Sequence, residues 1–266
     1  MLLMPHFSPG QQRGVDALAR DLEHVFGARL RSLVVYPGHQ GDGSVHAMAL
    51  IDNLVFRDLV ACLPFTSSWH HRGTGVPLLL TGEELRRTVD VFPLEYASIL
   101  IDYAVVHGAD PLRGLRIPVE DIRRACEAQA KGHLIHLREA FLESHGETTR
   151  VARLIAASAA PLRALLTNIA RLPTGAAAGA RQPGGGSPAP ANPSDEALAA
   201  LAEQRMRVPA AVIRDVLATS AHGHSAVTDP THLLARYIDA AEKIWTYVDQ
   251  WSMTPASARE QSGAPE

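Results

Sequence analysis

The proline- and glycine-rich stretch at 173–194 constrains the fold of this 266-residue chain more than any other feature. It contains no aromatic and no long aliphatic side chain, so it cannot contribute to a hydrophobic core. We therefore expect a flexible linker at 173–194, with folded elements before and after it. The polar residues 253–266 are expected to form a disordered tail.

The residues before this linker fall into two parts with different hydrophobic patterns. Up to about residue 116, short apolar runs alternate with amphipathic segments, which is typical of a sheet flanked by helices. From Pro118 onward, every apolar pattern has the period of a helix. We predict an α+β protein, with a mixed sheet and flanking helices in 1–116 and an all-α bundle in 117–252. The strands are expected at 33–36, 47–51, 76–80 and 103–106.

Composition narrows the range of functions. Lys and Arg total 25 against 28 Asp and Glu, so the net charge of -3 provides no overall basic field to attract nucleic acid or anionic membranes. No segment approaches the ~18 consecutive apolar residues of a membrane span. The two cysteines, Cys62 and Cys126, are too few for a disulfide framework and lack the spacing of a thiolate metal site. We expect a soluble cytoplasmic protein without a resident metal or cofactor.

Three stretches of the first part carry a more specific pattern. They are Leu30–Ile51, then Val76–Glu95, which reads VPLLLTGEELRRTVDVFPLE, and His107–Leu115, which reads HGADPLRGL. In their order and in their amino-acid sequence, these three stretches resemble bacterial proteins in which a DNA-polymerase-β-type nucleotidyltransferase domain precedes a helical domain. The resemblance covers roughly residues 10–172 and implies a nucleotidyltransferase-like sheet at the N-terminus.

In that superfamily the first strand ends in Gly-Ser, which holds the nucleotide triphosphate, and the second strand carries Asp-x-Asp. These two carboxylates and a third from a following strand bind two divalent metals that drive the transfer. The resemblance places Pro37-Gly38 at the Gly-Ser position, Val45 and Ala47 at the two aspartates, and Pro77 at the third acid. None of the last three side chains carries an oxygen for Mg²⁺. The resemblance therefore implies a degenerate site and a catalytically inactive protein that acts as a binding or regulatory partner.

Polar residues near the degenerate loop are candidates for binding a ligand. His39, Ser44 and His46 flank the loop, where imidazole groups can hold zinc or a phosphate. Asp90 is an acid close to the expected sheet. The alternative interpretation is that the histidines belong to a solvated loop and that Asp90 forms only local hydrogen bonds.

In a second hypothesis, the protein is an active enzyme. A metal-dependent nucleotidyltransferase would take its Mg²⁺ ligands from acids outside this register, and the available ones are Asp42, Asp52 and Asp90. No Asp-x-Asp or Glu-x-Glu occurs between residues 30 and 60. This hypothesis therefore predicts metal-dependent activity from a dispersed set of acids.

A third hypothesis concerns the helical part. Arg138 and His145 have a spacing that resembles the Arg-x(4–6)-His signature of HEPN-type ribonucleases, which implies a ribonuclease or a toxin–antitoxin component. The alternative is that Arg138 lies on the polar face of a bundle helix and that His145 interacts with its C-terminus. The broad apolar faces of these helices also predict a protein partner or a homodimer through the helical domain.

Overall fold

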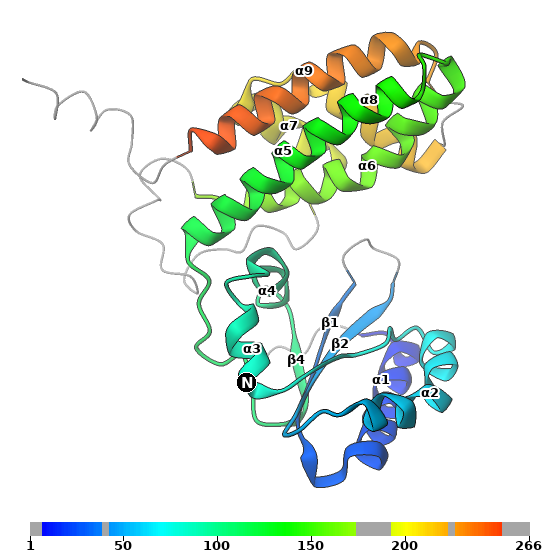
Figure 1. Ribbon diagram of the computed structural model, residues 1–266, viewed down its shortest axis with the longest axis vertical. Coiled ribbons are helices and arrows are strands. Elements are labelled where there is room, and N and C mark those ends of the chain that lie inside the picture. The colour runs from blue at the N-terminus through cyan, green and yellow to red at the C-terminus, as the bar shows by residue number, and fades with distance from the viewer. Residues whose placement is uncertain (1–6, 39–42, 174–192, 223–226, 252–266) are drawn as a thin grey trace, which may run out of the picture. The chain divides into compact units, whose positions relative to one another are not determined.

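The computed structural model describes residues 7–38, 43–173, 193–222 and 227–251 (Figure 1). Most of the predicted linker at 173–194 and the whole tail at 253–266 lie outside these residues. The chain divides into two compact units, Met1–Ile117 and Pro118–Glu266. The α+β class is confirmed, because the first unit contains a mixed four-stranded sheet and the described part of the second contains only helices.

The sheet has the strand order β3-β2-β1-β4. The central strand β1 pairs antiparallel with both β2 and β4, whereas β2 pairs parallel with β3. Each of the four strands overlaps a predicted one: β1 (Leu30–Pro37), β2 (Val45–Ile51), β3 (Leu78–Leu80) and β4 (Ala104–Gly108). β1 starts earlier than predicted because Leu30 already pairs with Ile51, and β2 starts earlier because Val45 pairs with Pro37.

Four helices flank this sheet: α1 (Pro9–Phe26), α2 (Phe56–His71), α3 (Gly82–Thr88) and α4 (Pro93–Ile99). Figure 1 shows α1 and α2 on one side of the sheet, whereas α3 and α4 lead from β3 to β4 on the other side. α1 begins with a capping box, in which the Ser8 hydroxyl accepts from Gln11 N and the Gln11 side chain accepts from Ser8 N. Thr81 and Glu84 cap α3 in the same reciprocal way.

The core of the first unit lies between the sheet and helices α1 and α2. Alternate residues of β2 face this core, because successive side chains of a strand point to opposite sides. The buried ring of Trp69 on α2 keeps a polar partner, since its indole N–H donates to Asp21 Oδ2 at 2.9 Å. The buried members are Val15, Leu18, Leu22 and Phe26 from α1, Leu30, Leu33 and Val35 from β1, Val45, Ala47, Ala49 and Ile51 from β2, Cys62 and Trp69 from α2, and Ala104 from β4.

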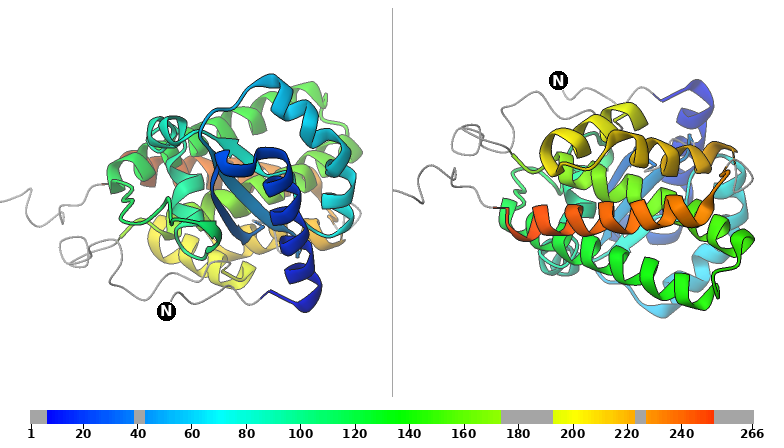
Figure 2. Two further views of the ribbon diagram at one scale, coloured as in Figure 1. Left: turned by 90° about the horizontal axis from the view of Figure 1, so that it is seen from below. Right: turned by 90° about the horizontal axis from the view of Figure 1, so that it is seen from above.

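The second unit is a bundle of five described helices. Within it, α5 packs against α6 and α9, and α8 packs against α6 and α7. The right view of Figure 2 shows α9, in orange, running along α5, in green. The helices are α5 (Val119–Glu143), α6 (Thr148–Ala170), α7 (Asp195–Met206), α8 (Ala210–His222) and α9 (Pro230–Asp249). Among the described residues, no helix combines the length and apolarity needed to cross a membrane.

A polar pair of the half-buried His133 and the buried Tyr237 joins α5 to α9, and it predicts how stability varies with pH. His133 Nε2 lies 2.6 Å from Tyr237 Oη, and burial, with a smaller contribution from nearby His136, lowers the pKa of His133 to about 4. An unfolded histidine titrates near 6.5, so on acidification the unfolded chain binds a proton that the folded chain does not. The free energy of unfolding of the second unit therefore decreases as the pH falls from about 6.5 toward 4.

We expect His133 to cost the second unit about 2 kcal/mol of unfolding free energy between pH 7.5 and pH 5. Urea denaturation of His133→Gln should show a correspondingly flatter pH dependence than that of the wild type. His232→Gln is the matched control, because His232 is an exposed histidine of the same unit, on α9, and makes no contribution to the lowered pKa of His133. The expectation fails if His133→Gln and the wild type lose the same stability over this pH range.

Candidate functional site

The structure brings the predicted degenerate positions together at one end of the sheet. Pro37 and Val45 face each other across β1 and β2, and Ala47 faces Val35 two residues further along. Pro77 directly precedes Leu78, the residue of β3 that pairs with Met48 beside Ala47. The turn between the strands is closed by a hydrogen bond from Gly38 N to Ser44 O at 3.0 Å.

The side chains of Val45 and Ala47 belong to the core, whereas Pro37 is exposed. Val45 is 0% exposed and Ala47 is 2% exposed, and both pack in the cluster that joins the sheet to α1 and α2. Pro77 is buried as well. An aspartate in place of Val45 or Ala47 would put a carboxylate into an apolar environment, which costs several kcal/mol unless the charge is compensated. The side chains of Val45, Ala47 and Pro77 offer no oxygen atom as a ligand for a divalent metal.

The candidate ligand-binding residues Ser44 and His46 alternate with Val45 on β2, so they point to the opposite side of the sheet. The His46 ring lies 5.8 Å from the Tyr36 ring, centroid to centroid, and burial raises the pKa of that tyrosine. His39 lies outside the described residues. Asp90 is exposed in the segment between α3 and α4.

Among the acids that an active enzyme would require, Asp52 lies away from this end of the sheet. Asp52 follows the far end of β2, seven residues after Val45 and so about 23 Å along the strand. It forms an ion pair with Arg31, whose side chain donates at 2.6 Å and 2.5 Å, and these hydrogen bonds lower the pKa of Asp52. Asp42 lies outside the described residues. In the parts of the chain that the structure describes, no three His, Cys, Asp or Glu side chains form a metal-binding group.

The two HEPN-like residues lie in ordinary helix-bundle positions. Arg138 on α5 donates to Glu242 on α9 at 3.4 Å, and both side chains are about half exposed. His145 is exposed in the turn between α5 and α6, where its φ is 53° and its N–H donates to Leu142 O at 3.1 Å. This N–H bond to the last turn of α5 makes His145 part of the helix end.

The comparisons with known proteins identify no family. No protein-family model matches the chain, and no curated protein matches it. The nucleotidyltransferase resemblance therefore stays a prediction that rests on the residues quoted above.

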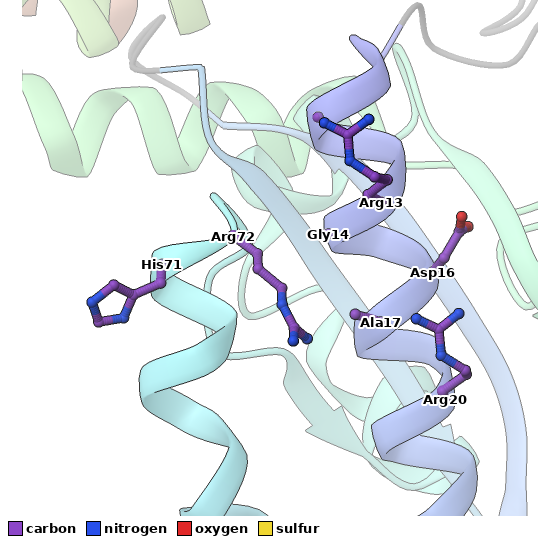
Figure 3. Close-up of a pocket in the computed structure, with 8 residues that line it drawn as sticks. Arg13, Gly14, Asp16, Ala17, Arg20, His71 and Arg72 are labelled. Atoms are coloured by element: carbon purple, nitrogen blue, oxygen red, sulfur yellow. The ribbon is translucent and has the colours of Figure 1, made fainter.

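An arginine-lined pocket between α1 and α2 was not predicted from the sequence. It has a volume of about 610 Å³. Its lining consists of Gly10, Arg13, Gly14, Asp16, Ala17 and Arg20 from α1, His71 at the end of α2, and Arg72, which follows α2. Figure 3 shows the Arg72 side chain extending from the end of α2 toward α1. Arg13 and Arg20 are seven residues apart, so their common helix face could have been noticed, but no sequence pattern places Arg72 beside them.

An exposed apolar face on α2 was also not predicted from the sequence. Phe56 is 79% exposed and Leu63 is 63% exposed, and with Leu59 and Val60 they have the i, i+3, i+4, i+7 spacing of one helix face. Solvent-exposed apolar faces of this kind are commonly buried in protein–protein contacts. The predicted partner surface was placed on the helical part, where Leu142 on α5 is similarly exposed.

Proposed function

We propose that the first unit is a nucleotidyltransferase-like module without metal-dependent transfer activity, and that the protein is a cytoplasmic binding or regulatory partner. The observation that carries the proposal is the burial of Val45 and Ala47 in the core, at the two positions where the resemblance expects metal carboxylates. Two divalent cations need several hard oxygen ligands, and an apolar core offers none.

The phosphate-binding part of the expected site is altered as well. Pro37 has no backbone N–H to offer a phosphate. The N–H of the next residue, Gly38, is already used, because it donates to Ser44 O across the turn. The two residues at the Gly-Ser position therefore offer a triphosphate no free backbone donor. This supports a binding function over the active-enzyme alternative based on Asp42, Asp52 and Asp90.

A turnover measurement tests the proposal. The wild-type chain is incubated with ATP, GTP, CTP or UTP, with Mg²⁺ or Mn²⁺, and with bulk RNA and protein as acceptors. We expect no pyrophosphate release above the rate without the protein, because the metals that neutralise the leaving pyrophosphate have no ligands at Val45 and Ala47.

A further inference from the structure

The pocket between α1 and α2 has a composition that the proposed function does not explain. Three guanidinium groups surround it, those of Arg13, Arg20 and Arg72, and one carboxylate, that of Asp16, lies at its edge (Figure 3). Within the described residues, none of the three arginines forms an ion pair with an acid. Asp16 accepts a hydrogen bond from Gln12 Nε2 at 2.8 Å. The pocket is therefore locally cationic in a chain whose net charge is -3.

A glycine allows α2 to end close enough to α1 to complete the pocket. A Cβ atom on Gly14 would lie 2.6 Å from Arg72 O and 3.3 Å from Thr74 Cγ2. Gly14 is buried, although glycine in a helix interior costs about 1 kcal/mol relative to alanine. The close contact between Gly14 and Arg72 O fixes the backbone of Arg72 against α1. The backbone position of the third arginine is therefore set by core packing and not by a loop.

The dimensions of the pocket point to a ligand with more than one phosphate. Arg13 and Arg20 lie two helical turns apart, which is about 10 Å along α1, and Arg72 reaches toward α1 from the neighbouring helix. The planar guanidinium group donates two parallel hydrogen bonds to phosphate oxygens, so it suits a phosphate better than a lysine does. The three arginines start from two positions about 10 Å apart along α1 and from the end of α2, a spread that suits a chain of two or three phosphates better than a single phosphate group.

We propose that Arg13, Arg20 and Arg72 bind the phosphate chain of a small polyphosphate, such as pyrophosphate or a nucleoside triphosphate, without a divalent metal. A small ligand is favoured over nucleic acid because the positive charge is confined to one pocket of a chain that is acidic overall. This surface is distinct from the β1–β2 end of the sheet, so the proposal holds whether or not the first unit is related to nucleotidyltransferases.

Calorimetric titration with inorganic triphosphate in EDTA tests the site. We expect the wild type to bind, and Arg72→Gln and Arg13→Gln each to weaken binding by about tenfold to hundredfold, the usual effect of losing a charge-assisted hydrogen bond. Arg86→Gln is the matched control, since Arg86 is an exposed arginine on α3, on the other side of the sheet. Arg86→Gln should leave the affinity unchanged.

Asp16→Asn is expected to strengthen binding, and misfolding of the variant cannot produce that result. It removes the carboxylate at the edge of the pocket, so triphosphate should bind severalfold more tightly. The proposal is overturned if the wild type does not bind triphosphate, if Arg86→Gln weakens binding as much as Arg72→Gln, or if a single-stranded RNA binds through these arginines while triphosphate does not. Pyrophosphate release with Mg²⁺ is measured separately, so metal-dependent turnover would contradict the proposed function without affecting this site.

Discussion

Replacing Val45 with aspartate is expected to unfold the first unit and not to create a metal site. The Val45 side chain is fully buried at the start of β2, within a cluster of apolar residues from α1, β1 and α2. A carboxylate there has no cationic partner in the cluster, and a buried uncompensated charge costs more than a typical core truncation. We expect a loss of about 4 kcal/mol or more, a large part of the 5–15 kcal/mol that stabilises a typical domain.

Circular dichroism during urea denaturation measures this loss, with and without Mg²⁺. His46→Asp is the matched control, because His46 is the next residue of β2, points to the other side of the sheet and is partly exposed. It should cost about 1 kcal/mol or less. If Val45→Asp kept the wild-type stability and gained further stability from Mg²⁺, position 45 would open onto a cleft, and the account of a filled core would be wrong.

Replacing Gly108 with alanine is expected to disrupt the edge of the sheet. Gly108 ends β4 opposite Ser32 of β1, and its φ is 71°. An added Cβ would lie 1.9 Å from Arg31 O and 2.8 Å from Arg31 C, both backbone atoms of the central strand. Because these atoms cannot rotate away, β4 would have to separate from β1, and we expect a loss of about 3 kcal/mol or more.

Gly114→Ala separates the effect of this contact from that of the backbone angle. Gly114 has a φ of 76°, but a Cβ there would meet no atom within 4 Å. We expect about 1 kcal/mol of destabilisation from the left-handed backbone alone. Chemical denaturation of the two variants gives the comparison. Equal losses in the two variants would show that the approach of Gly108 to Arg31 does not constrain the sheet.

The sequence predicts the local elements of this fold well because their signals are local. The four strands, for example, follow from short apolar runs, and the reciprocal caps at Ser8–Gln11 and Thr81–Glu84 each involve residues within four positions of one another. The early start of β1 could not be predicted, because Leu30 is extended through its pairing with Ile51, far along the chain. Strand pairing depends on such distant contacts, which periodicity within a short window does not contain.

The candidate site was predicted less completely for the same reason. The resemblance identifies Val45 and Ala47 as positions without carboxylates, but alternation alone does not tell which side of the sheet they face. The structure places them in the core with α1 and α2. The arginine pocket requires Arg72 to meet α1 across a gap of about fifty residues in sequence, and this meeting depends on the packing of Gly14.

The most direct test of the central claim is the metal dependence of pyrophosphate release by the wild-type chain. We predict that release from all four nucleoside triphosphates equals the protein-free rate with Mg²⁺ or Mn²⁺ and does not change when EDTA is added. Metal-dependent release above that rate, abolished by Asp52→Asn or Asp90→Asn, would contradict the claim and would show that acids outside the β1–β2 end of the sheet support catalysis.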